Sequence, residues 1–176
     1  MKILLIDNND SFTYNLAHLI YGCTNVEPEI KIYGKEAFVG LEKYSRIFIS
    51  PGPGAPEEYP LYERIKDVKT PVTGICLGMQ ILNVLFGGKV ERGEPVHGKV
   101  SRVAFNGSDY NIARYHSLYC SKVAECFDTI TVFDGIPMII QHKNMPYTGI
   151  QFHPESFMSE GSKELMRYVF YDACSA

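Results

Sequence analysis

Residues 71–80 read PVTGICLGMQ and join two kinds of local structure. The first half is rich in β-branched residues, as a short strand is. The second half opens an apolar run that ends at a pair of glycines, as a helix does. Cys76 lies where the strand becomes the helix, and Gly74 and Gly78 flank it because only small residues permit so tight a turn. The pattern is typical of a nucleophile elbow.

Cys76 at this position is a candidate nucleophile, because the backbone N–H groups and the positive end of the helix dipole favour its thiolate form. A thiolate nucleophile needs a base, and His153 with Glu155 supplies one late in the chain. Two residues apart in an extended segment, their side chains point to the same face. The carboxylate can then orient the imidazole, so we predict a Cys-His-Glu triad. The alternative is a small buried cysteine without chemistry.

The loop Ser50–Gly54 reads SPGPG and follows an apolar strand at Arg46–Ile49. Its side chains are nearly absent, so its backbone N–H groups can approach a ligand closely. Acyl transfer needs donors aimed at a developing oxyanion. We predict that a backbone N–H of Gly52 or Gly54 and the N–H of Leu77 form this oxyanion hole. Taken alone, the loop would indicate only a rigid turn.

The composition is that of an ordinary globular protein, with 45% hydrophobic and 21% charged residues among 176. This length fits one domain, residues 1–176. The formal net charge of −3, without a polybasic block, argues against a nucleic-acid partner. The apolar runs are too short for a signal peptide or a membrane span. Five scattered cysteines without C-x-x-C spacing indicate reduced thiols in the cytoplasm, and we expect neither a metal nor another cofactor.

The first half of the chain alternates strands with helices. Strands are expected at residues 3–6, 26–33, 46–50 and 71–75. Helices are expected after the first strand to about residue 21, at residues 59–68 and after Cys76, with a short helix or loop at residues 38–44. Asp10 or Ser11 is the expected cap of the first helix. This alternation predicts a parallel sheet covered by helices on both faces.

The second half consists mainly of short strands separated by turns. They are expected at residues 89–92, 100–105, 112–115, 129–133, 138–142 and 148–152, followed by a helix at residues 160–171. Asn106-Gly107 is a strong hairpin signal, and Asp134-Gly135 marks a further turn. We therefore expect an α/β protein in three layers, with a flavodoxin-like, open, mostly parallel sheet and an antiparallel β extension in the second half.

Taken together, these segments resemble the class I glutamine amidotransferases. The amidotransferase domain of that family carries PGPG, G-x-C-x-G-x-Q and H-P-E in this order. The resemblance extends almost from end to end. The segments that look like the small subunits of anthranilate synthase and aminodeoxychorismate synthase are residues 7–15, 95–99, 114–118 and 149–156. Met79 departs from the pattern of these small subunits, which usually have His there, and residues 54–71 and 103–115 look shorter than in relatives.

The resemblance implies roles for further residues. Because Gln80 lies one helical turn after the cysteine, its amide can also reach a polar substrate. The residues implied to bind the substrate L-glutamine are Gly52, Gln80, Ser117 and Leu118, the last two through their backbone. The residues implied to contact a partner subunit are Asp10, Ser11, His97, Gly98 and Lys99.

The implied reaction is hydrolysis of glutamine and delivery of ammonia to a separate synthase subunit that aminates chorismate. The product is either anthranilate, for tryptophan, or aminodeoxychorismate, for folate, and the sequence does not separate the two. A free-standing γ-glutamyl peptidase with the same three residues is a further alternative. A flavodoxin-like binding module with an inert Cys76 is the non-enzymatic one. Iodoacetamide labelling that shows no preference for Cys76 would support that last interpretation.

Overall fold

The computed structural model of the chain describes residues 1–96 and 98–168. His97, which the resemblance assigns to the partner interface, lies outside the described residues. Within the described part of the chain, no helix is both long enough and apolar enough to cross a membrane.

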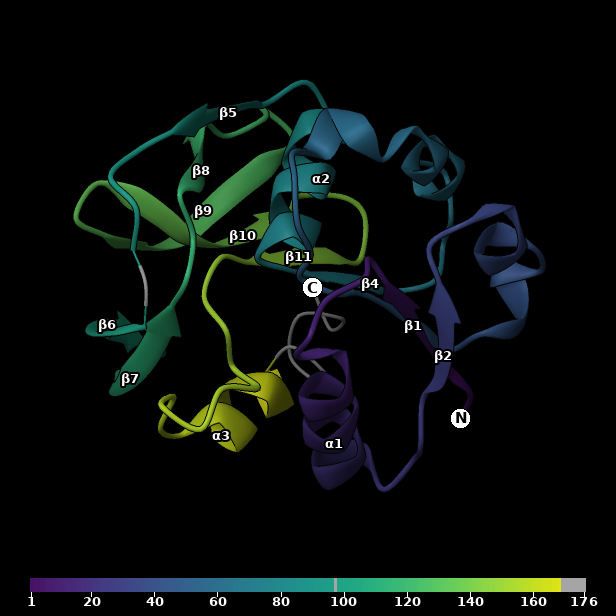
Figure 1. The fold of residues 1–176 in the computed structure, drawn as a ribbon, viewed down its shortest axis with the longest axis horizontal. Helices are drawn as coiled ribbons and strands as arrows, with labels where there is room; N and C mark the ends of the chain where they lie inside the picture. The colour runs from purple at the N-terminus through teal and green to yellow at the C-terminus, as the bar shows by residue number, and fades with distance from the viewer. Residues whose placement is uncertain (97, 169–176) are drawn as a thin grey trace.

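A seven-stranded sheet forms the middle layer (Figure 1). From one edge to the other it contains β2 (Glu29–Ile32), β1 (Ile3–Asp7), β3 (Arg46–Ile49), β4 (Val72–Ile75), β11 (Tyr147–Ile150), β10 (Ile136–His142) and β9 (Phe127–Phe133). The first five strands are parallel to one another. β10 pairs antiparallel with both of its neighbours, β11 and β9. The predicted mostly parallel sheet with an antiparallel extension is confirmed.

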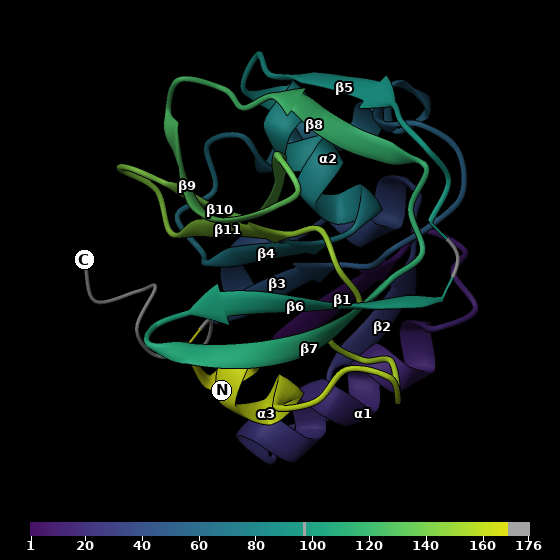
Figure 2. The same ribbon diagram turned by 90° about the vertical axis from the view of Figure 1, so that its left-hand side faces the viewer.

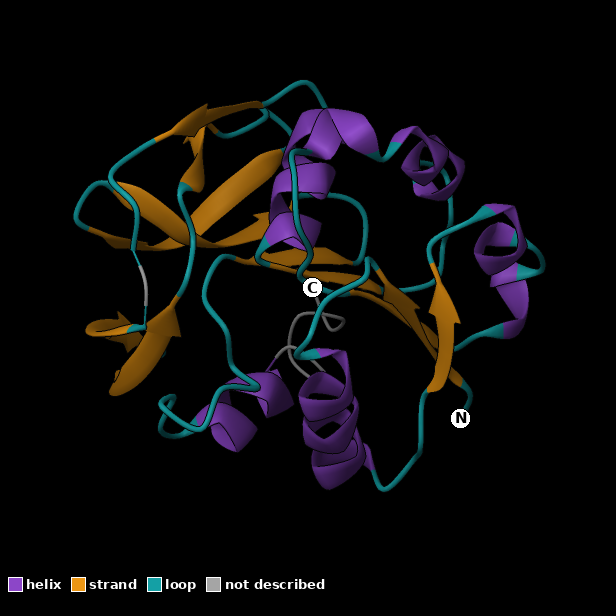
Figure 3. Cartoon of the chain, in the orientation of Figure 1, coloured by secondary structure: helices purple, strands orange, loops and turns teal. Residues whose placement is uncertain are grey.

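Helices cover both faces of this sheet, as predicted (Figure 3). α2 (Leu77–Leu85) lies on one face, together with short 3₁₀ segments at Lys35–Phe38, Leu41–Lys43, Pro56–Glu58 and Pro60–Ile65. α1 (Thr13–Thr24) and α3 (Ser162–Arg167) lie side by side on the other face.

Strand β1 shows why the protein has two cores. Its apolar residues are fully buried. Leu4 and Ile6 belong to the core beneath α2, whereas Ile3 and Leu5 belong to the core beneath α1 and α3. Successive side chains of a strand point to opposite faces, so a wholly apolar strand is stable only when both faces are covered.

Two small antiparallel pairs lie on opposite sides of the main sheet (Figure 2). β5 (Lys89–Arg92) pairs with β8 (Leu118–Lys122), and β6 (Lys99–Phe105) pairs with β7 (Ser108–Arg114). Asn106 and Gly107 join β6 to β7 with φ values of 48° and 77°. Positive φ at both positions is what a two-residue hairpin turn requires, so the hairpin prediction is confirmed.

Several predicted boundaries are wrong. The residue before α1 is Phe12, not the predicted cap Asp10 or Ser11, and the helix continues to Thr24, past the predicted end near residue 21. The Asp10 carboxylate instead accepts the Phe12 N–H at 2.8 Å in a turn before the helix. Residues 59–68 form 3₁₀ turns and no α-helix. Pro56 and Pro60 account for this, since proline lacks an N–H and disfavours the helical conformation of the residue before it. The strand predicted at residues 112–115 begins earlier, at Ser108.

Candidate active site

Cys76 occupies the turn between β4 and α2, as the sequence predicts. Its backbone has φ 51° and ψ −103°, which an L-residue rarely adopts and which costs about 1–3 kcal/mol. The Cys76 N–H donates to the carbonyl oxygen of Ile150 on β11 at 2.6 Å, and the Gln80 N–H closes the first helical turn onto the Cys76 carbonyl oxygen. These bonds to both neighbouring elements hold the strained turn in place.

The two glycines around Cys76 are required by close backbone contacts. A Cβ atom on Gly74 would lie 2.3 Å from the carbonyl carbon of Gly78. A Cβ atom on Gly78 would lie 2.6 Å from the carbonyl oxygen of Ile49 on β3. Each distance is far below van der Waals contact, so the G-x-C-x-G spacing follows from how tightly α2 approaches the sheet.

The structure brings His153 and Glu155 to Cys76. The Nδ1 atom of His153 lies 2.6 Å from Oε1 of Glu155, and the Glu155 side chain is fully buried. Burial by itself lowers the pKa of His153. The electrostatic attraction of the Cys76 sulfur, its hydrogen bond to the ring and the Glu155 carboxylate outweigh burial and raise that pKa well above its usual range. The arrangement favours the imidazolium form of His153.

Two aromatic rings shield the imidazole of His153. The ring of Tyr115 meets it edge-on, with centroids 5.2 Å apart and an interplanar angle of 86°. The ring of Phe12, from the loop before α1, lies 6.1 Å from the imidazole and 5.9 Å from Tyr115. Because these rings exclude water, the charges of the site interact more strongly than they would in solvent.

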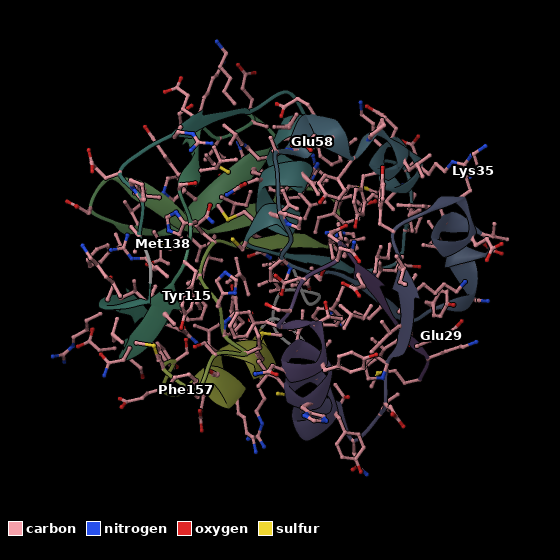
Figure 4. All side chains as sticks on the ribbon, in the orientation of Figure 1. Glu29, Lys35, Glu58, Tyr115, Met138 and Phe157 are labelled. Atoms are coloured by element: carbon pink, nitrogen blue, oxygen red, sulfur yellow. The ribbon has the colours of Figure 1, made fainter. Side chains whose placement is uncertain are left out.

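A cleft of about 370 Å³ opens above Cys76. Its lining contains every residue predicted for the oxyanion hole and for the substrate, namely Gly52, Gly54, Leu77, Gln80, Ser117 and Leu118, together with Pro53, Ala55, Glu58, Arg92, Tyr115 and His116. Figure 4 shows Glu58 beside α2 and Tyr115 beside β7. The walls carry one carboxylate, on Glu58, and one guanidinium, on Arg92, neither of which the sequence indicated.

Asn8 positions the SPGPG loop from the end of β1. Its backbone N–H and its Nδ2 donate to the Oγ and the carbonyl oxygen of Ser50, each at 2.9 Å. The hydroxyl of Tyr62 donates to Asn8 Oδ1 at 2.7 Å. A Cβ atom on Gly52 would lie 2.6 Å from the Asn8 Cβ, so this loop position tolerates only glycine. Asn8 thus holds the loop against the sheet through the hydroxyl and the carbonyl oxygen of Ser50.

Gln80 and Gln151 form a buried pair beside Cys76. Gln80 Nε2 donates to the carbonyl oxygen of Leu118 at 2.9 Å and to Oε1 of Gln151 at 3.2 Å. Gln151 Nε2 in turn donates to the Cys76 sulfur at 3.6 Å. No role for Gln151 is predicted from the sequence. Its position two residues before His153, on the same face of an extended segment, was the signal that could have indicated one.

His116 is a second buried imidazole at the cleft, and it is neutral. Burial lowers its pKa to about 4, and the nearby Arg114 guanidinium lowers it too. Its Nδ1 lies 3.1 Å from the carbonyl oxygen of Leu118, to which it donates. Its Nε2 is buried without a hydrogen-bond partner among the described residues. The imidazole thereby orders the backbone of Ser117 and Leu118 next to the cleft.

Met79, which departs from the family pattern, lies in the core beneath α2. Its side chain is fully buried, and a Cβ atom on Gly149 of β11 would lie 2.7 Å from its Cγ. Met79 therefore packs α2 onto β11, and it does not line the cleft.

The described residues predicted for a partner interface lie just outside the cleft. Ser11 is exposed, and the half-buried Asp10 is close enough to His153 and Glu155 to interact with them electrostatically. A Cβ atom on Gly98, whose φ is 59°, would lie 3.5 Å from the Tyr115 ring. Both predicted segments thus adjoin the aromatic rings around His153. Lys99 follows as an exposed residue at the start of β6.

Comparisons with known proteins agree with this geometry. The family model Glutamine amidotransferase class-I matches residues 4–173. Anthranilate synthase component 2 of Haemophilus influenzae is 36% identical over 188 residues, covering 94% of each chain. Aminodeoxychorismate synthase of Streptomyces griseus is 35% identical over 182 residues, covering 94% of this chain and 25% of that one.

The fold has a counterpart among solved structures. A glutamine amidotransferase from Thermotoga maritima superposes with a TM-score of 0.77 at 18% identity, covering 100% of this chain and 99% of that one. The flavodoxin-like arrangement of a mostly parallel sheet between helices is common to both. The family model covers nearly the whole chain, and a relative of similar length is 36% identical to it. The chain therefore belongs to the class I glutamine amidotransferase family.

Proposed function

We propose that this chain is a glutaminase subunit that hydrolyses L-glutamine and passes the ammonia to a synthase. The observation that carries the proposal is the contact of Cys76, His153 and Glu155 at a strained elbow beside a cleft. A nucleophile, a base in hydrogen-bond contact with it and a carboxylate orienting that base are the parts that covalent acyl transfer needs.

In the first half-reaction, the Cys76 thiolate attacks the side-chain amide carbon of glutamine. The negative charge moves to the amide oxygen, which accepts from the N–H of Leu77 and an N–H of Gly52 or Gly54. His153 gives its proton to the amide nitrogen as the C–N bond breaks. Ammonia leaves, and a glutamyl thioester remains on Cys76.

In the second half-reaction, water attacks the thioester carbon. His153, now neutral, takes a proton from that water, and the C–S bond breaks to restore the thiolate. Glutamate is the product. Glu155 accepts from the Nδ1–H of His153 throughout, so it keeps the other ring nitrogen facing the sulfur and stabilises the imidazolium.

The cleft also suits the head of a free amino acid. Arg92 on one wall complements an α-carboxylate, and Glu58 complements an α-ammonium group. The backbone of Ser117 and Leu118, ordered by His116 and Gln80, supplies further donors and acceptors. Both Nε2 hydrogens of Gln80 are engaged, so its carbonyl oxygen is the group that it offers to the substrate.

The partner we propose is a chorismate-aminating synthase in the cytoplasm, with the whole chain, residues 1–176, acting as one amidotransferase domain. The support is the relative named Anthranilate synthase component 2, which this chain matches over 94% of both lengths. A second candidate partner is an aminodeoxychorismate synthase, which the Streptomyces griseus relative favours. Mixing the chain with each synthase and identifying the aminated product separates the two.

The test of the glutaminase role is Cys76→Ser in the complex. We expect loss of glutamine-dependent product formation, by at least about 1,000-fold, because the nucleophile is gone. Product formation from added ammonium salt should stay at the wild-type rate. Equal loss of both activities would refute the role. Rapid turnover of γ-glutamyl peptides by the chain alone would favour a peptidase.

A further inference from the structure

We propose that Gln151 is a fourth working member of the site, which donates a hydrogen bond to the Cys76 sulfur through both half-reactions, and that Gln80 is the residue that positions it. The inference rests on the proposed glutaminase function and adds a role to it.

The orientation of the Gln151 amide follows from its neighbours. Gln80 Nε2 donates one hydrogen to the carbonyl oxygen of Leu118 at 2.9 Å and the other to Oε1 of Gln151 at 3.2 Å. With its oxygen held in this way, Gln151 must turn its NH₂ group toward Cys76, where Nε2 lies 3.6 Å from the sulfur. Gln151 is completely buried, so no water can replace either bond.

The chemistry explains why a second donor is useful. A hydrogen bond to an anion is about twice as strong as one between neutral groups, so the Gln151 amide stabilises the thiolate more than the thiol. His153 also contacts the sulfur, but it loses its proton to the departing ammonia. At the thioester stage His153 is neutral and must accept a proton from water. Gln151 keeps its hydrogens, and it can therefore stabilise the sulfur when the C–S bond breaks.

None of the other titratable groups around the sulfur takes over the hydrogen bond that Gln151 donates. His153 and Glu155 face it from the segment after β11, and Asp10 and His116 act on the His153 ring. Cys120 on β8 also faces Cys76, but burial and the Cys76 charge raise its pKa to about 12. Cys120 is thus a neutral thiol at any assay pH near neutrality.

The test uses Gln151→Met and Gln151→Glu and measures the rate of Cys76 alkylation by iodoacetamide from pH 5 to 10. Met has a similar length and no donor. Glu keeps an acceptor for Gln80 but also lacks a donor to the sulfur. In both variants we expect the midpoint of the curve of alkylation rate against pH to lie at least about one pH unit higher than in the wild type. Below the midpoint, Cys76 should then react about tenfold more slowly than in the wild type.

The matched control is Thr131→Val, which removes the part-buried bond from Thr131 Oγ1 to the carbonyl oxygen of Ala104 at 2.8 Å. Thr131 lies on the edge strand β9, and β11 and β10 separate this strand from β4, the strand before Cys76. It should lower thermal stability modestly and leave the profile unchanged. A wild-type profile in either folded Gln151 variant overturns the role of Gln151 alone. Absence of preferential Cys76 alkylation in the wild type would instead overturn the proposed glutaminase function, so the two failures are distinguishable.

Discussion

Two buried imidazoles at the active site differ in protonation state because their neighbours differ. His153 lies between the Cys76 sulfur and the Glu155 carboxylate, which together outweigh burial and favour the imidazolium. His116 is buried beside the Arg114 guanidinium, and each of these influences favours its neutral form. Because the two rings also repel when both are charged, the neutrality of His116 helps His153 to stay protonated.

The depressed pKa of His116 predicts a pH dependence of stability. Its folded-state pKa of about 4 lies below the ordinary value of 6.5, so below pH 6.5 the unfolded chain binds a proton that the folded chain does not. The free energy of unfolding should therefore fall as the pH drops from 6.5 toward 4. His116 alone should remove about 2 kcal/mol between pH 7 and pH 5.

Urea unfolding of the wild type and of His116→Gln at both pH values measures this contribution. Gln can still donate to the carbonyl oxygen of Leu118, and it does not titrate, so the variant should show a loss smaller by about 2 kcal/mol. Equal losses in the two proteins would show that His116 is already protonated in the folded state at pH 5, or that it does not titrate on unfolding.

The active-site residues that could be predicted from the sequence all lie in short motifs with a recognisable spacing. Glycines on either side of Cys76 and the alternation of His153 with Glu155 are visible in a few consecutive letters. Gln151 and Arg92 acquire their positions from contacts across more than fifty residues or from a separate pair of strands. No local pattern distinguishes them from other polar residues in strands.

At the scale of elements, the turn from β4 to α2 is the feature on which the site depends. Gly74→Ala should prevent this turn, because the new Cβ would meet the backbone of Gly78, which cannot move away without displacing α2. We expect a loss of at least about 3 kcal/mol in the free energy of unfolding, or failure to fold. Chemical denaturation monitored by circular dichroism measures it.

The control for this substitution is Gly22→Ala in α1. There the new Cβ would lie 3.5 Å from the Lys163 side chain, an ordinary contact, and the residue is within a helix. Alanine should stabilise the protein by about 0.5–1 kcal/mol. Similar effects of the two substitutions would mean that the elbow relaxes more easily than its contacts indicate.

Elements with strong local patterns were predictable, and elements decided by tertiary contacts were not. Both hairpins joined by Asn106-Gly107 and Asp134-Gly135 were indicated, because these dipeptides adopt positive φ at low cost. β8 was missed, since its only buried residue is Cys120 and its pairing with β5 determines its conformation. Residues 56–65 form 3₁₀ turns in place of the predicted helix, because Pro56 and Pro60 disfavour the α-helix that the apolar spacing indicates.

For the molecule as a whole, the sheet gathers the active site at one edge. The segments after β1, β3, β4 and β11 carry Asn8, the SPGPG loop, Cys76 and His153 to the carboxyl ends of four neighbouring parallel strands. Ligands bind at this edge in open α/β sheets generally. The loop at residues 10–12 and the segment beginning at Gly98 border the same edge, so a synthase bound there would cover the cleft and receive ammonia directly.

The last prediction concerns this proposed docking edge. Lys99→Glu reverses a charge on an exposed residue beside it, whereas Lys35→Glu makes the same reversal at the opposite side of the molecule from Tyr115 (Figure 4). If the synthase binds at the edge, Lys99→Glu should weaken the complex about tenfold, because an altered interface charge is repelled or left unpaired. Lys35→Glu should bind normally, and both variants should keep wild-type alkylation of Cys76. Titration by light scattering or calorimetry measures the affinities, and equal affinities for the two variants would place the partner elsewhere.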